Sequence, residues 1–269
     1  MVKKLFKHEI DAYIRTVIPM HLVLLGVAII SRFLQLFEND SDAYAIVFGS
    51  SIVAYVVTAI VCLVLTIFFC IKRFYSNLFT HEGYLSLTLP VTSTQHIMVK
   101  NTVAVLAQIA SIIMIIICTC ALGMGDVCIE VFKAIGYMLN VFYNTFDYHA
   151  TLFIIEAIVN LVLGIAGSMM IYYACIAIGQ RAKKNRVACA IGVYFIYYLI
   201  SQVIGTVFIV LFSVFYDAWN IEKLVQYLSN HPTVSVHLYF GLLFVISTIL
   251  YTIGFIITKR TLDRKLNLE

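Results

Sequence analysis

Six long apolar segments dominate this 269-residue sequence, and they restrict the chain to one fold class. Hydrophobic residues make up 62% of the chain and charged residues only 12%, whereas charged residues are about a quarter of a soluble domain. Each segment is near or above the roughly 20 residues that an α-helix needs to cross a bilayer. The sequence therefore predicts an all-α membrane protein, a single domain of residues 1–269 with spans at 16–37, 45–71, 102–125, 150–179, 187–216 and 238–258.

The basic residues predict how these spans are oriented, because cytoplasmic loops carry an excess of lysine and arginine. With the N-terminus inside, all but three of the 18 basic residues fall on the cytoplasmic side, and the exceptions are Arg32, Lys133 and Lys223. We therefore expect a multi-pass protein of the cell membrane with both termini in the cytoplasm.

Two further stretches have apolar residues at helical spacing but are too polar or too short to be spans. Residues 129–146 predict an amphipathic or re-entrant helix at the outer surface. Residues 1–15 predict an amphipathic helix that lies along the inner membrane surface, and a frayed charged tail is the alternative.

The cytoplasmic connection at residues 72–101 has the pattern of an ordered structure. Phe74 and Leu78 would form one apolar stripe of a short helix that breaks at Gly83. Beyond Pro90, the spacing of Thr92 and Gln95 predicts a capping box at the start of the helix that leads into the third span. We therefore expect a helix, a sharp turn, a short extended piece and a second helix.

Motifs for catalysis and for metal binding are absent from the sequence. Each of two His-Glu pairs, His8-Glu9 and His81-Glu82, lacks the second histidine four residues after the first that a zinc protease needs. The seven cysteines have no paired spacing, and no phosphate-binding loop of the form G-x-x-x-x-G-K-[ST] occurs. The sequence predicts a protein that is not an enzyme and holds no cofactor or metal, so any ATP hydrolysis would occur in another subunit.

One ionisable residue stands out within a predicted span. Glu156 is in the fourth span, and Asn160 follows one helical turn later on the same face. A carboxylate within a span is by default a candidate functional group, so both residues are candidates for a substrate pathway. The alternative is a carboxylate that reaches the outer interface, with Gly164 and Ser168 serving close helix packing.

The topology and the stretch at residues 74–92 together resemble the permease subunits of bacterial type 2 ABC transporters. Short permeases of that family carry a stretch of the form N-L-x-x-x-E-G-Y-L-x-x-x-L-P-V at this place. The stretch covers under a tenth of the chain, and it is matched here by Asn77, Leu78, Glu82, Gly83, Tyr84, Leu85, Leu89, Pro90 and Val91.

The resemblance implies that this loop holds a coupling helix, which docks in a cleft of a separate ATPase subunit. It also implies that the N-terminal helix is a connecting helix and that the chain forms half of a pathway with a second permease, either a copy of itself or a sister chain. Glu82 would pair with a basic residue of the ATPase, or with Lys72, Arg73 or Lys100 of its own chain. The expected coupling residues are Phe74, Leu78, Glu82, Gly83, Tyr84 and Leu85.

Export is favoured over import because the outer loops are short, and the family is associated with export of antimicrobial peptides, drugs, lipids or glycans. Three alternatives stay open. The loop could be purely structural, the chain could be a self-sufficient carrier or channel, or it could be a membrane sensor or immunity protein without a pump partner. A carrier would show repeated halves and polar groups deep in the spans, and only Glu156 and Asn160 point that way.

Overall fold

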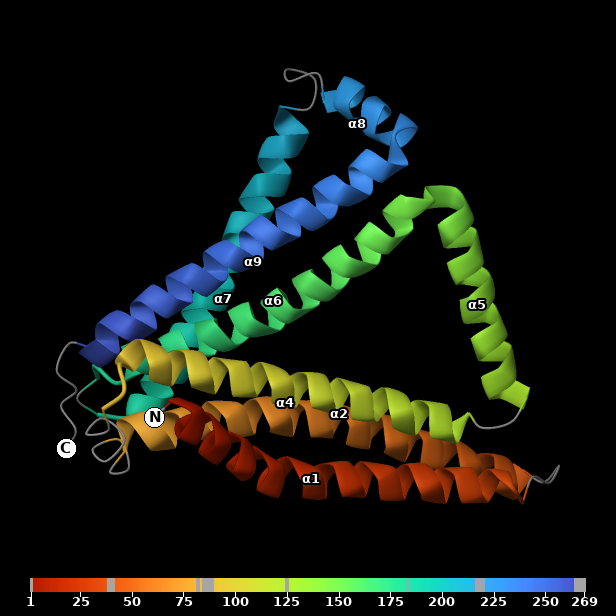
Figure 1. The fold of residues 1–269 in the computed structure, drawn as a ribbon, viewed down its shortest axis with the longest axis horizontal. Coiled ribbons are helices and arrows are strands. Elements are labelled where there is room, and N and C mark those ends of the chain that lie inside the picture. Colours follow the sequence, from red (N-terminus) through yellow and green to blue (C-terminus); the bar gives the residue numbers. More distant parts are fainter. Residues whose placement is uncertain are drawn as a thin grey trace. The chain divides into compact units, whose positions relative to one another are not determined.

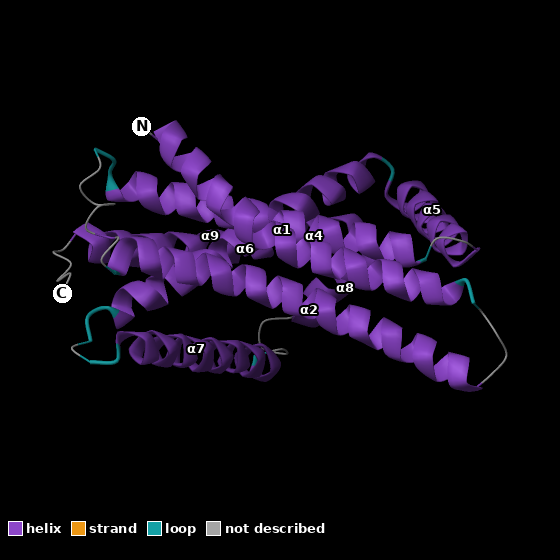
Figure 2. Ribbon diagram, turned by 90° about the horizontal axis from the view of Figure 1, so that it is seen from below, coloured by secondary structure: helices purple, strands orange, loops and turns teal. Residues whose placement is uncertain are grey.

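The computed structural model of the chain describes residues 2–37, 42–80, 83, 90–123, 126–182, 184–215 and 221–263. Within these ranges every regular element is an α-helix (Figures 1 and 2). Six helices are long and apolar enough to cross a membrane, which confirms the all-helical, multi-pass prediction. They are α1 (Val2–Gln35), α2 (Asp42–Phe79), α4 (Ser93–Leu122), α6 (Tyr148–Gly179), α7 (Arg186–Val214) and α9 (Pro232–Asp263).

The chain divides into two compact units, Met1–Val141 and Phe142–Glu269. The first unit holds the spans α1, α2 and α4, and the second holds α6, α7 and α9. The prediction of a single membrane domain stays a prediction, because two compact units can belong to one domain in a bilayer.

In the first unit α1, α2 and α4 pack against one another in pairs, as Figure 1 shows. Buried apolar side chains from all three helices form one cluster, which contains Leu24, Ala28, Tyr55, Ala59, Cys118 and Leu122. The helices α1 and α4 are parallel, because residue numbers increase in the same direction along both: Glu9 contacts Lys100, and His21 contacts Ser111. The helix α2 runs against both, which is the alternation that short connections between spans produce.

Polar side chains also join the three helices inside the first unit. The hydroxyl of Ser111 in α4 lies 3.0 Å from His21 Nε2 in α1 and 3.0 Å from Thr66 Oγ1 in α2. Further along, the Tyr55 hydroxyl lies 2.7 Å from Thr119 Oγ1. Such bonds between spans each contribute about 1 kcal/mol, and they fix the rotation of each helix.

The N-terminal segment is part of a longer helix. Residues 1–15 were expected to form a separate interfacial helix, but α1 runs unbroken from Val2 to Gln35 and includes Pro19. Glu9, Tyr13 and Val17 are buried at four-residue spacing, so the inward face of this segment packs on the unit. The apolar stripe that suggested membrane-surface binding is therefore at least partly a packing face, and its relation to the lipid stays a prediction.

The connection between the second and third spans is shorter than expected. The helix predicted around Phe74 and Leu78 is the final part of α2, which ends at Phe79, and α4 already begins at Ser93. The predicted capping box is confirmed: Gln95 N donates to Thr92 Oγ1 at 3.3 Å, and Thr92 N donates to Gln95 Oε1 at 3.1 Å. The extended piece expected between the helices falls on residues 84–89, outside the described part of the chain.

In the second unit α6 packs against α9 and α7. Close approach depends on glycines, because a Cβ on Gly254 would lie 2.9 Å from backbone atoms of Met170, and one on Gly179 would lie 2.7 Å from Ala190. The parallel direction of α6 and α9 follows from successive contacts, which run from His149 with His237 to Gly254 with Met170.

Two helices are not long apolar spans. The helix α5 (Asp126–Phe146) forms where an amphipathic helix was predicted, and its position at the outer surface stays a prediction. The short helix α8 (Ile221–Asn230) was not predicted. Its signal was present in the sequence as Ile221, Leu224, Val225 and Leu228, four apolar residues at helical spacing.

Candidate functional site

A buried carboxylate joins the three helices of the first unit near the start of the 80–92 connection. Glu9 Oε2 of α1 accepts a hydrogen bond from Arg73 Nε of α2 at 2.6 Å. Glu9 Oε1 accepts from Lys100 Nζ of α4 at 2.7 Å and from Asn77 Nδ2 of α2 at 3.3 Å. One side chain therefore binds both helices that flank the connection.

The charges of this Glu9 cluster (Glu9, Arg73, Asn77 and Lys100) are largely removed from solvent. The side chains of Glu9 and Lys100 are only 2% and 4% exposed, and that of Arg73 is 16% exposed. Ionised groups at this depth are costly to desolvate, so they depend on one another for compensation. The arrangement holds the cytoplasm-facing ends predicted for these helices in one geometry.

The structure describes three of the six predicted coupling residues. Phe74 and Leu78 are 1% and 0% exposed, so the end of α2 is held by buried apolar side chains. Gly83 N donates to Thr80 O at 2.8 Å, and a Cβ at Gly83 would lie 2.6 Å from Leu78 O, so only glycine fits this turn without movement. Glu82, Tyr84 and Leu85 lie outside the described residues, and the coupling role of all six stays a prediction.

The intrachain partners considered for Glu82 are largely engaged elsewhere. Arg73 Nε and Lys100 Nζ both bind Glu9, which the sequence reasoning did not connect with either residue. Lys72 is exposed on α2, and Arg73 Nη2 is buried without a hydrogen-bond partner among the described residues. These two groups remain as intrachain candidates for Glu82.

In the second unit Glu156 is the end of a chain of polar groups between α6 and α9. Its Oε1 lies 2.7 Å from His237 Nδ1, and His237 Nε2 lies 3.0 Å from His149 Nδ1. An ionised carboxylate can only accept, so His237 donates from Nδ1. The chain therefore runs from His149 of α6 through His237 of α9 to the carboxylate of Glu156.

Asn160 lies one turn further along α6, on the face that the sequence predicted. Its Nδ2 donates to the backbone oxygen of Glu156 at 2.9 Å and to that of Phe240 in α9 at 3.3 Å. Glu156 Oε2 and Asn160 Oδ1 are buried, and neither has a hydrogen-bond partner among the described residues. The prediction that these two residues share a face is confirmed, and their place on a substrate pathway stays a prediction.

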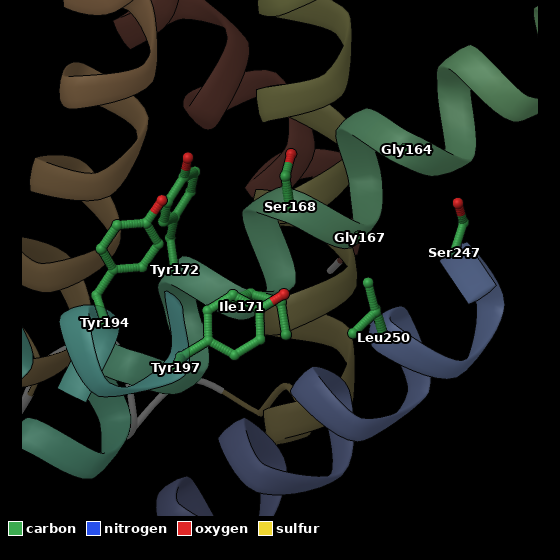
Figure 3. A pocket seen from close by; sticks show the side chains of 9 residues that line it. All are labelled: Gly164, Gly167, Ser168, Ile171, Tyr172, Tyr194, Tyr197, Ser247 and Leu250. Carbon is green, nitrogen blue, oxygen red and sulfur yellow. The ribbon is translucent and has the colours of Figure 1, made fainter. Parts of the chain in front are cut away.

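A cavity of about 330 Å³ lies further along the same side of α6 (Figure 3). Three tyrosines dominate its wall, with the ring centres of Tyr172 and Tyr194 5.3 Å apart and those of Tyr194 and Tyr197 6.3 Å apart. The other lining residues are Gly164, Gly167, Ser168, Ile171, Ser247 and Leu250. The wall is mainly apolar, and the tyrosine and serine side chains contribute hydroxyl groups to it.

Sequence reasoning missed the partners of both Glu9 and Glu156. His237 is 81 residues from Glu156, and Lys100 is 91 residues from Glu9, so no local pattern connects them. A signal existed for the second unit, since a carboxylate inside a span requires a polar partner and His149 lies seven residues before Glu156. The tyrosine cavity carried no usable signal, because tyrosines are frequent throughout the chain.

No group of three or more histidine, cysteine or acidic residues within the described ranges could hold a metal ion. Comparison with known protein families, with curated proteins and with solved structures finds no match for this chain.

Proposed function

We propose that the chain is the membrane-spanning permease subunit of an ATP-driven ABC exporter, which receives force from a separate ATPase subunit through residues 74–92. The observation that carries the proposal is the Glu9 cluster, which ties α1, α2 and α4 together beside the 80–92 connection. A permease without a nucleotide site needs a stiff cytoplasmic element, because a slack loop would absorb a displacement without moving the spans.

The buried anchors on α2 support the same proposal. Phe74 and Leu78 are buried in the last two turns of α2, and the Thr92 capping box starts α4 on the other side of the connection. A force applied to residues 80–92 would therefore be transmitted to the end of α2 and to the start of α4. In this account Phe74 and Leu78 act by anchoring, while Glu82, Tyr84 and Leu85 supply the contact with the ATPase.

The full proposal includes the location and the assembly of the protein. The chain lies in a bacterial cytoplasmic membrane with both termini inside, and it pairs with a copy of itself or with a sister permease to complete the translocation pathway. The distribution of the 18 basic residues supports this orientation.

Co-purification tests the proposal. The tagged chain, produced in its source organism and extracted in mild detergent, should retain a protein with a P-loop whose ATP hydrolysis is measurable in the complex. As a control, a variant with Glu82, Tyr84 and Leu85 changed to alanine should fold but lose this partner or its stimulated ATP hydrolysis. Purified chain without any P-loop protein, under conditions that keep the membrane complexes of the same cell intact, would contradict the proposal.

A self-sufficient carrier remains the second candidate, and one observation favours it. Each unit contributes three spans, with its first and third spans parallel and packed together: α1 with α4, and α6 with α9. Three-span repeats with an acidic residue inside a span are typical of secondary carriers. The carrier would remain active in liposomes without ATP or a partner, whereas the proposed permease would not.

A further inference from the structure

The two acceptor oxygens between α6 and α9 form the most distinctive unused feature of the second unit. Glu156 Oε2 and Asn160 Oδ1 are buried, lie one helical turn apart on one face, and have no hydrogen-bond partner among the described residues. A buried acceptor without a donor costs about 1–3 kcal/mol, so two together indicate a place where a donor binds.

The hydrogen bonds that Glu156 and Asn160 already make determine which of their atoms can bind a ligand. Asn160 uses Nδ2 for two backbone oxygens, which leaves only its carbonyl oxygen for a ligand. Glu156 uses Oε1 for His237, which leaves Oε2. Both free groups accept and neither donates, and one of them carries a negative charge.

We propose that Glu156 and Asn160 bind the primary ammonium group of an amphipathic ligand. An ammonium offers three donors and a positive charge, which matches two acceptor oxygens, one of them on a carboxylate in a span. A divalent metal ion fits less well, because Ca²⁺ and Mg²⁺ take about six or more oxygen ligands or retain several waters.

The path for the apolar part of the ligand runs along α6. Gly164 lies eight residues after Glu156, about 12 Å away at the helical rise of 1.5 Å per residue, and it lines the near end of the tyrosine cavity. Figure 3 shows Gly164 and Gly167 on α6 beside Ser247 and Leu250 of α9. A Cβ built on Gly164 meets nothing within 4 Å, so the helix has open space there. An alkyl chain would lie along this seam.

This inference rests on the proposed function only for the step of transport. Binding itself needs the purified chain and no ATPase, so a failure of binding leaves the exporter proposal standing. Two sources could supply the ligand chemistry: a free amphipathic amine, or an ethanolamine lipid of the bilayer, whose headgroup is also a primary ammonium.

The experiment uses the full chain in nanodiscs of phosphatidylcholine, a lipid without a primary ammonium group. Octylammonium, octyltrimethylammonium and octanol are titrated separately, and the unfolding temperature reports binding because a ligand of the native state stabilises it. A fourth series replaces part of the lipid by phosphatidylethanolamine. We expect stabilisation by octylammonium or by the ethanolamine lipid, and little or none by the trimethylated cation or the alcohol, which identifies the source as well.

Three variants test the site. Glu156→Gln replaces the carboxylate by a neutral amide, so it should weaken ammonium binding at least tenfold. The control is Glu130→Gln at an exposed position of α5, which should leave ammonium binding unchanged. Gly164→Leu adds a side chain where a Cβ meets nothing within 4 Å, and it should weaken octylammonium binding while leaving methylammonium binding unchanged.

The inference is overturned if octanol or octyltrimethylammonium stabilises the wild-type chain as much as octylammonium and the ethanolamine lipid do. It is equally overturned if Glu156→Gln and wild type respond alike to octylammonium. The comparison of ligands on the wild-type chain decides the question even if Glu156→Gln does not fold.

Discussion

At the scale of single residues, Glu9 is the side chain on which the first unit depends most. Its two carboxylate oxygens receive bonds from two cations that belong to different helices. A buried ion pair is weak support for overall stability, since an apolar replacement of the whole group can be as stable. What the Glu9 cluster does supply is a unique arrangement, because Arg73 and Lys100 have no equally good position once Glu9 is lost.

Replacing Glu9 by alanine should therefore be severe. Removing one partner from a buried charge cluster costs about 3–5 kcal/mol, and here it leaves Lys100 buried without its carboxylate. The measurement is reversible unfolding of the chain in bicelles or nanodiscs. Asp11→Asn, a charge change at an exposed position of the same helix, is the matched control and should cost less than about 0.5 kcal/mol. If Glu9→Ala lowers the free energy of unfolding no more than Asp11→Asn does, the Glu9 cluster has no structural importance.

At the scale of elements, two pairs of helices approach closely at a glycine, α6 with α9 at Gly254 and α6 with α7 at Gly179. At Gly254 the backbones of α6 and α9 approach closely, whereas a Cβ on Gly164 would meet nothing within 4 Å. Small residues permit this approach between spans, where van der Waals packing and hydrogen bonds take the place of the hydrophobic effect. The close approach at Gly254 fixes the two helices, and the cavity lies beside the segment of α6 from Gly164 to Tyr172.

Gly254→Ala should disturb the contact of α6 with α9, whereas Gly241→Ala in the same helix should not. A Cβ at position 254 would lie 2.9 Å from the backbone of Met170, which cannot give way like a side chain, while one at position 241 meets nothing within 4 Å. We expect a loss of about 1–3 kcal/mol for the first variant and a small gain for the second, because alanine favours the helix. Unfolding measurements in the same bicelles compare them, and a stable Gly254→Ala variant would contradict the close approach.

At the scale of the whole molecule, the sequence predicted what depends on composition and short spacing. Six spans follow from apolar length, and the start of α4 follows from Thr92 and Gln95, three residues apart. The interactions of Glu9 with Arg73 and of Glu156 with His237 join residues 64 and 81 positions apart, and only tertiary packing determines them. The continuous α1 and the extension of α2 to Phe79 were missed because a change from amphipathic to uniformly apolar residues does not interrupt a helix.

The account's central claim is that another chain drives these helices through residues 74–92, and site-specific photo-crosslinking tests it most directly. A photoreactive amino acid replaces Tyr84 in the connection, and the same group at Glu222, in the outer loop predicted from charge, is the control. Irradiation of intact cells should join the chain to a P-loop ATPase from position 84 and not from position 222. A crosslink to the ATPase from neither position, or from position 222 alone, would contradict the claim.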